Sequence, residues 1–315
     1  VDNGTQSALM VPTEILAEQH YLNIRPFCEK LDIEIKLVTS ALKGKERKSH
    51  FEDIQSGKTQ IVIGTHSLIQ KDIQFKNLGL AVIDEQHRFG VMQREALGKK
   101  GDQPHLLIMT ATPIPRSLAL TLYGDMDVSL LDELPPGRQE IATNLFFDNR
   151  REQAYAIMEK ELQQGRQAFV VCPLIEESES IDLKAAVTVF DFIQEKFPNF
   201  TACLIHGKLK KEERQNIMSR FLKKEIQVLV STTVIEVGID VPNATVMIIE
   251  HAERFGLAQL HQLRGRVGRG IHASQCLLIA YHPVSEEGQA RMKAMQSSGD
   301  GFVIAEEDLK IRGPG

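Results

Sequence analysis

Three arginines alternate with glycines in the segment 259–270, which reads QLHQLRGRVGRG. Guanidinium groups are planar, permanently charged and suited to phosphate oxygens, and glycine lets the backbone approach a partner closely. A second candidate lies far upstream, where Asp84 and Glu85 directly follow the apolar run 80–83. One carboxylate can hold a hard cation such as Mg²⁺, and its neighbour can act as a base. Together the two segments predict the two halves of a site for a metal-bound polyphosphate.

Each segment also has a simpler interpretation. The arginine segment alone could be a solvated basic turn or a patch that contacts nucleic-acid backbone. Asp84 and Glu85 alone could be the polar end of a strand. It is the combination of acids and arginines in one chain that favours a nucleotide site.

The composition is that of an ordinary globular protein, with 42% hydrophobic and 25% charged residues among 315. This length is sufficient for two domains. The formal net charge of -5 argues against a binder that depends on overall positive charge, although a local groove can be basic. With no membrane-length apolar run and no leader, we expect a cytoplasmic protein without membrane association. We expect four cysteines to be small core residues with reduced thiols, namely Cys28, Cys172, Cys203 and Cys276.

The sequence contains a weak internal repeat with an offset of 167 residues. In the first copy, a strand-like run at 33–40 precedes a helical pattern and a second strand that ends at Gly64-Thr65. The same order follows from Phe200 and ends at Ser231-Thr232. A strand–helix–strand unit with near-continuous apolar strands predicts parallel pairing in a sheet covered on both faces. We therefore predict an α/β protein with two lobes of similar topology.

The segment 134–138, which reads LPPGR, marks the predicted break between the lobes, because two prolines and a glycine disfavour helix and central strand. We predict a first lobe at 1–134, a linker at 135–145, a second lobe at 146–285 and a further element at 286–315. In such sheets ligands sit beyond the carboxyl ends of the strands. Asp84, Thr65 and Thr232 are all expected at such ends.

The acidic and arginine segments, together with several others in the chain, resemble the sequence motifs of superfamily 2 helicases. Motifs II, III and VI correspond to 84–87 (DEQH), 110–116 (TATPIPR) and 262–269 (QLRGRVGR). Motifs Ia, Ib, IV, IVa and V correspond to 12–20, 64–66, 171–178, 206–207 and 230–244. The segments 301–309 and 312–315 are similar to the start of the element that follows the second lobe in one family of these enzymes. The set is specific, spans essentially the whole chain and is most similar to RecG-type ATP-dependent DNA helicases.

The resemblance implies two tandem RecA-like lobes, of which the first is missing its P-loop strand and helix. The run 56–59 reads SGKT, but Glu52 stands where a P-loop requires glycine, and the run precedes a strand instead of following one. We therefore expect the P-loop to lie just before Val1 in a larger motor. The 315 residues alone are expected to have no appreciable ATPase, because the amides and lysine that cradle the phosphates are absent.

The resemblance also implies roles in binding and hydrolysing ATP. Asp84 would hold Mg²⁺ through water, and Glu85 would polarise the attacking water. Arg266 and Arg269, from the second lobe, would reach the phosphates, so hydrolysis would depend on lobe closure. The other residues implied at the nucleotide are Gln86, His87, Gly238 and Asp240.

Sequence-independent contacts to a nucleic-acid backbone are implied for five residues, Thr13, Thr65, His66, Thr232 and Thr233. Hydroxyls and backbone amides at strand ends can hold phosphates without reading bases. Each threonine alone could equally be a helix cap or a strand-end hydrogen bond. The matched placement of Thr65 and Thr232 in the two repeats favours a shared function.

The resulting hypothesis is the motor region of a monomeric ATP-dependent helicase or translocase that remodels branched double-stranded DNA, such as replication forks and Holliday junctions, in recombination and repair. One alternative is the motor of a transcription-repair coupling translocase, which Gln86 disfavours because a second acidic residue is expected there. Another is a non-catalytic nucleic-acid-binding module. The joint presence of Asp84, Glu85, Arg266 and Arg269 argues against that module.

Overall fold

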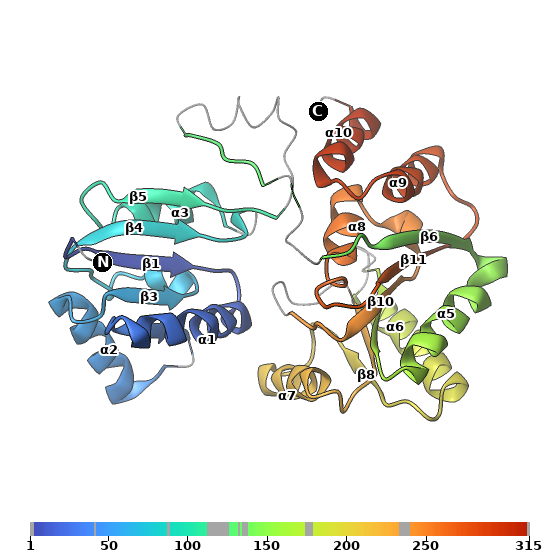
Figure 1. Cartoon of the computed structure of the whole chain (residues 1–315), viewed down its shortest axis with the longest axis horizontal. Helices are drawn as coiled ribbons and strands as arrows, with labels where there is room; N and C mark the ends of the chain where they lie inside the picture. Colours follow the sequence, from blue (N-terminus) through green and yellow to red (C-terminus); the bar gives the residue numbers. More distant parts are fainter. Residues whose placement is uncertain are drawn as a thin grey trace. The chain divides into compact units, whose positions relative to one another are not determined.

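The computed structural model describes residues 3–40, 42–86, 89–111, 126–131, 133, 138–173, 179–232 and 240–313. The described residues form two compact units, one up to Ala111 and one from Met126 onward (Figure 1). Each unit is built on its own parallel β-sheet with helices on both faces. The predicted fold class, two tandem α/β lobes with parallel sheets, is confirmed.

The first unit contains a five-stranded sheet with the order β2-β3-β1-β4-β5. Its strands are β1 (Gln6–Met10), β2 (Ile35–Val38), β3 (Ile61–Gly64), β4 (Leu78–Ile83) and β5 (His105–Ile108). Its helices are α1 (Glu14–Lys30), α2 (Gly44–Ser56), the short η1 (His66–Ile69) and α3 (Val91–Gly98). Leu16 and Cys28 of α1 cover one face of the sheet, and Ile54 of α2 and Leu97 of α3 belong to the core on the other.

The second unit contains a six-stranded sheet with the order β6-β11-β10-β7-β9-β8. Its strands are β6 (Ala142–Phe147), β7 (Gln167–Cys172), β8 (Ala202–Ile205), β9 (Val228–Thr232), β10 (Ala244–Ile249) and β11 (Gln275–Ala280). Its helices are η3 (Asp148–Arg150), α5 (Arg151–Gln163), α6 (Glu179–Lys196), α7 (Lys211–Leu222), η4 (Ala252–Arg254), α8 (Leu257–Arg264), α9 (Glu286–Ser297) and α10 (Gly301–Arg312). β7, β9 and β10 are buried along their whole length, as expected for the centre of a parallel sheet.

The internal repeat is present in the structure with the predicted offset. β2 and β8 begin 167 residues apart, and so do β3 and β9. The pairing register is also the same, since Ile35 pairs with Ile61 in one unit and Ala202 pairs with Val228 in the other. The two units are therefore built from equivalent strand–helix–strand modules.

Two details concern the predicted domain ranges. β6 begins at Ala142, inside the range 135–145 predicted as a linker, because it pairs in parallel with β11 and forms an edge of the second sheet. The range 286–315 contains α9 and α10, which pack against each other and against α8. None of the described helices is long and apolar enough to cross a lipid bilayer.

Candidate nucleotide and nucleic-acid site

Asp84 lies at the carboxyl end of β4, and three hydrogen bonds fix its position. Its backbone N–H donates to Met10 O at the end of β1 (3.0 Å). Its side-chain Oδ1 accepts from the backbone N–H of Glu85 (2.8 Å), and Oδ2 lies 3.2 Å from His20 Nε2 on α1. The carboxylate is 21% exposed, so it is oriented by the protein but remains accessible to a ligand.

Glu85 is buried and has a φ of 52°, in the left-handed region that residues other than glycine rarely adopt. Such backbone strain costs about 1–3 kcal/mol and occurs mostly at functional sites. The neighbouring Gln86 is also buried, and its N–H donates to Met109 O (3.2 Å). The acidic turn is thus joined to the chain just before Thr110. His87 and Thr112 lie outside the described residues.

Carboxylate oxygens suit Mg²⁺, which binds proteins through one or two carboxylates together with phosphate and water oxygens. In the described part of the chain, no group of three or more His, Cys, Asp or Glu residues is arranged to hold a metal by itself. Asp84 therefore fits a Mg²⁺ ion that arrives with phosphate ligands, and Glu85 lies beside it on the same turn. This arrangement could orient a water for attack on a phosphate.

Arg264 is the last residue of α8 and the first arginine of the segment 259–270, and it is buried. Its guanidinium group donates to the carbonyls of Met295 (3.0 Å), Ser298 (2.8 Å) and Gly299 (3.2 Å). It also donates to His261 Nδ1 (2.9 Å). Arg264 therefore anchors α8 to the turn between α9 and α10.

The glycines of the arginine segment pack within their own unit. A Cβ atom on Gly270 would lie 2.2 Å from Pro242 O, and Gly268 has a φ of 74° with Ile141 beside it. The expectation that glycine here lets a bound partner approach is corrected for Gly270, whose close neighbour is the Pro242 backbone. This contact holds the arginine segment against the chain that follows Asp240.

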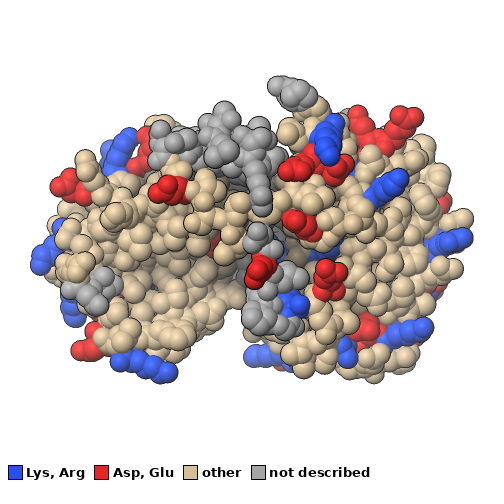
Figure 2. Space-filling model, turned by 45° about the horizontal axis from the view of Figure 1, so that its top comes forward, with Lys and Arg blue, Asp and Glu red and all other residues tan. Residues whose placement is uncertain are grey.

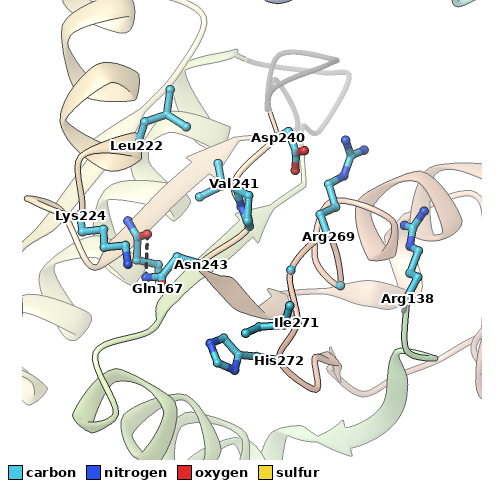
Figure 3. Close-up of a pocket in the computed structure, with 13 residues that line it drawn as sticks. Arg138, Gln167, Leu222, Lys224, Asp240, Val241, Asn243, Arg269, Ile271 and His272 are labelled. Carbon is cyan, nitrogen blue, oxygen red and sulfur yellow. Dashed lines mark hydrogen bonds between the residues drawn. The ribbon is translucent and has the colours of Figure 1, made fainter. Parts of the chain in front are cut away.

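The two predicted phosphate-binding arginines differ in exposure. Arg266 is buried, whereas Arg269 is exposed and its Nε donates to Gly265 O (3.1 Å). Arg269 lines a pocket of about 890 Å³ together with Asp240 and Arg138 (Figure 3). Figure 3 shows these three side chains along one side of the pocket. Arg138 was not predicted as a site residue.

Asp240 carries a feature that is typical of a ligand site. Its Oδ1 is buried and has no hydrogen-bond partner among the described residues. The Asp240 carboxylate can accept from hydroxyl groups, and the Arg269 guanidinium that lines the same pocket can donate to phosphate oxygens. The pocket residues therefore fit a nucleotide, whose ribose supplies hydroxyls and whose phosphates attract arginine. Gly238 lies outside the described residues.

The predicted nucleic-acid contacts have different environments. Thr13 is the N-cap of α1, and its hydroxyl accepts from the backbone N–H of Leu16 (3.3 Å). Thr65 and Thr232 are buried at the carboxyl ends of β3 and β9, as the repeat predicts, and Thr65 Oγ1 lies 3.4 Å from Ser67 Oγ. His66 is exposed on η1. Thr233 lies outside the described residues.

His20 has a contact with a predicted site residue that the sequence analysis did not foresee. It lies on α1 seven residues after Thr13, about two helical turns, and 64 residues before Asp84 in the sequence. The only available sequence signal was a histidine within the motif Ia segment. On the face drawn in Figure 2, acidic and basic side chains are interspersed.

The family model of the DEAD/DEAH box helicases matches residues 1–121, and that of the helicase conserved C-terminal domain matches residues 150–270. The chain is 52% identical to the ATP-dependent DNA helicase RecG of Synechocystis sp. over 100% of this chain and 38% of the relative. It is also 52% identical to the protein of that name from Bacillus subtilis, over 99% of this chain and 46% of the relative. The chain thus spans less than half of these relatives.

Solved structures also include a RecG protein that matches this chain. A RecG structure bound to a three-way DNA junction matches with a TM-score of 0.81 and 47% identity, over 99% of this chain and 41% of that chain. The helicase Lhr of Mycobacterium smegmatis, at 19% identity and a TM-score of 0.68, supports the fold alone. Since identity to RecG proteins extends over the whole chain and both of its sheets match a RecG structure, the chain belongs to the RecG-type helicases of superfamily 2.

Proposed function

We propose that this chain is the motor region of an ATP-dependent DNA helicase that remodels branched DNA, such as replication forks and Holliday junctions, in recombination and repair. Similarity to proteins named ATP-dependent DNA helicase RecG, and to a RecG structure bound to a three-way DNA junction, supports this proposal. The natural protein would act as a monomer in the cytoplasm, where chromosomal DNA of bacteria such as these relatives resides.

The observation that supports the proposal is that each unit contains residues suited to part of a polyphosphate site. The first unit has an accessible Asp84 carboxylate beside the strained Glu85. The second has Asp240 and the exposed Arg269, which line the same pocket. MgATP supplies the chemistry that both are suited to, namely a magnesium-bound phosphate chain and a ribose with hydroxyl donors.

In this function, Asp84 would hold the metal through water, and Glu85 would orient and deprotonate the attacking water. Arg266 and Arg269 would bind the phosphates and stabilise the charge that develops during transfer. Asp240 and Gly238 would bind the nucleotide. Gln86 and His87 would respond to the terminal phosphate, and the Met109 carbonyl that accepts from Gln86 gives this response a path toward Thr110.

We propose that the ends of β3 and β9 contact the DNA backbone. Thr65 and Thr232 are buried, so the exposed His66 and the backbone amides beyond these strands would make the first contacts, together with Thr13 and Thr233. Such contacts are sequence-independent, and binding should weaken steeply with salt.

The test measures DNA-stimulated ATP hydrolysis and unwinding of a three-way junction by the natural protein that contains this chain. Glu85→Gln and Arg269→Ala should each lower hydrolysis by about 10³-fold or more while junction binding persists. Arg25→Ala, which removes an exposed ion pair with Glu29 on α1, serves as the control and should have wild-type activity. Junction binding without any hydrolysis by the wild type would favour a non-catalytic module. Displacement of RNA polymerase without junction unwinding would favour a transcription-repair coupling translocase.

A further inference from the structure

We propose that His20 is a positioning residue that sets the orientation of the Asp84 carboxylate for Mg²⁺. This inference rests on the proposed function, because it assigns a role at the same metal site. It starts from one contact in the first unit, the 3.2 Å distance between His20 Nε2 and Asp84 Oδ2. Because the carboxylate can only accept, the imidazole donates through an N–H at Nε2.

With the hydrogen bond from His20, each of the two Asp84 carboxylate oxygens accepts a hydrogen bond from the protein. Oδ1 accepts from the Glu85 N–H, and Oδ2 accepts from His20. Rotation about the last side-chain bond of aspartate is otherwise broad. With both oxygens engaged, the carboxylate plane is fixed while each oxygen retains acceptor capacity for a metal-bound water.

The two side chains are also held by rigid parts of the fold. Asp84 follows β4, and its N–H donates to Met10 O at the end of β1. α1 begins four residues after Met10 and carries His20. β1 and β4 pair in parallel, so the histidine and the aspartate are joined through adjacent strands as well as directly. Their separation is therefore a property of the core of the unit.

The exposure of the pair fits a role at a ligand site. The side chains are 28% and 21% exposed, so the hydrogen bond lies at the edge of the core instead of inside it. A polar contact between two partly exposed side chains contributes little to stability. Hydrogen bonds to metal-binding carboxylates, in contrast, commonly change metal affinity by about 10–100-fold.

His20 also connects the metal site to a proposed DNA contact. α1 has Thr13 as its N-cap and places His20 about two turns later. The same helix therefore carries a proposed DNA contact at its start and the residue that orients Asp84 two turns later.

The experiment uses Mn²⁺ as a paramagnetic substitute for Mg²⁺ and measures its dissociation constant, by electron paramagnetic resonance, in the natural protein with bound ADP. His20→Ala should raise this constant by about 10–100-fold. His20→Gln, whose amide can donate from a similar position, should restore it to within about 3-fold of the wild type. Asn23→Ala, at an exposed position on the same helix, is the matched control and should leave the constant unchanged. ADP affinity without metal should be the same in all four proteins.

A wild-type Mn²⁺ dissociation constant for His20→Ala would overturn the proposal. An equal loss in His20→Ala and His20→Gln would do so too. If His20→Ala does not fold, the proposal is tested on the wild type. Bound Mn²⁺ must then broaden the NMR signals of the His20 ring more strongly than those of the His105 ring. Failure of the proposed function gives a different result, since the wild type would then bind no metal together with ADP.

Discussion

Gln60 and Gln227 lie 167 residues apart and make the same hydrogen bond in the two units. Each side-chain Oε1 accepts from the backbone N–H of the residue that precedes the edge strand, Glu34 (2.8 Å) in one unit and Thr201 (2.9 Å) in the other. Each glutamine directly precedes the strand next to that edge. The side chain therefore closes the amino end of the strand pair, and the module that repeats includes its side-chain hydrogen bonds.

A second glutamine pair, Gln6 and Gln167, extends the same arrangement and gives the first prediction. Gln167 Nε2 donates to Phe221 O (2.6 Å) and Ile226 O (2.8 Å), and all of these groups are buried. Gln167→Leu would remove this donor from both carbonyls; Phe221 O keeps the N–H of Lys224 (3.0 Å), whereas Ile226 O loses its amide partner, which costs about 1–3 kcal/mol. We expect the free energy of unfolding of the second unit to fall by about 1–3 kcal/mol in urea titrations followed by circular dichroism.

Gln289→Leu is the control for this prediction. Gln289 is exposed on α9, and exposed substitutions usually change the free energy of unfolding by less than about 0.5 kcal/mol. A Gln167→Leu variant as stable as Gln289→Leu would show that Ile226 O finds another donor and that the Gln167 amide is dispensable.

A buried carboxylate at the end of β10 gives the second prediction. Glu250 is only 1% exposed and accepts from Tyr155 (2.5 Å), Tyr281 (2.7 Å) and Arg151 (2.9 Å). Burial, together with this carboxylate, raises the pKa of Tyr155 well above its ordinary value, so its hydroxyl stays a donor. Glu250→Ala would remove the carboxylate that accepts from the arginine and from both hydroxyls, and should cost about 3–5 kcal/mol of unfolding free energy.

Thermal unfolding compares Glu250→Ala with Glu225→Ala, which removes only an exposed ion pair with Arg220. Glu225→Ala should change the free energy of unfolding by less than about 1 kcal/mol. Similar melting temperatures for the two variants would contradict a structural role for the Glu250 cluster.

His261 gives the third prediction, which concerns pH. Burial, and then the nearby Arg264 cation, lower the pKa of His261 from 6.5 to about 4 in the folded protein. The unfolded chain therefore binds more protons than the folded one between these values, so stability rises with pH across this window. Lowering the pH from about 6.5 to about 4 should progressively destabilise the second unit, with no further loss from this group below that range.

His261→Gln tests this prediction, because a glutamine oxygen can still accept from Arg264 but does not titrate. Urea unfolding at a series of pH values should show a smaller loss of stability in this window for His261→Gln than for the wild type. His282→Gln, at a largely exposed position, should keep the wild-type slope. Parallel curves for His261→Gln and the wild type would show that other groups cause the slope.

Local sequence patterns predicted much of the fold. The repeat offset indicated the two equivalent modules, and a helix cap was one of the two interpretations of Thr13, which is the N-cap of α1. The contact between His20 and Asp84 was not predictable, since it joins residues 64 positions apart whose neighbours give no pairing pattern. The same holds for Gly270 and Pro242, because a requirement for glycine depends on which backbone lies opposite.

The last prediction concerns the close approach of Gly270 and Pro242. In Gly270→Ala, the new Cβ would lie 2.2 Å from Pro242 O, and both partners are backbone, so the arginine segment must shift. Overpacking of this kind costs about 1–3 kcal/mol. Because Pro242 follows Asp240 by two residues and Gly270 directly follows Arg269, the shift should also separate the two side chains that line the pocket. We expect weaker ADP binding by calorimetry together with lower stability.

Gly299→Ala is the matched control, since its Cβ would have no neighbour within 4 Å and its carbonyl stays available to Arg264. If Gly270→Ala lost stability but bound ADP as tightly as Gly299→Ala, the packing of these two segments would not position Arg269 and Asp240 for the nucleotide.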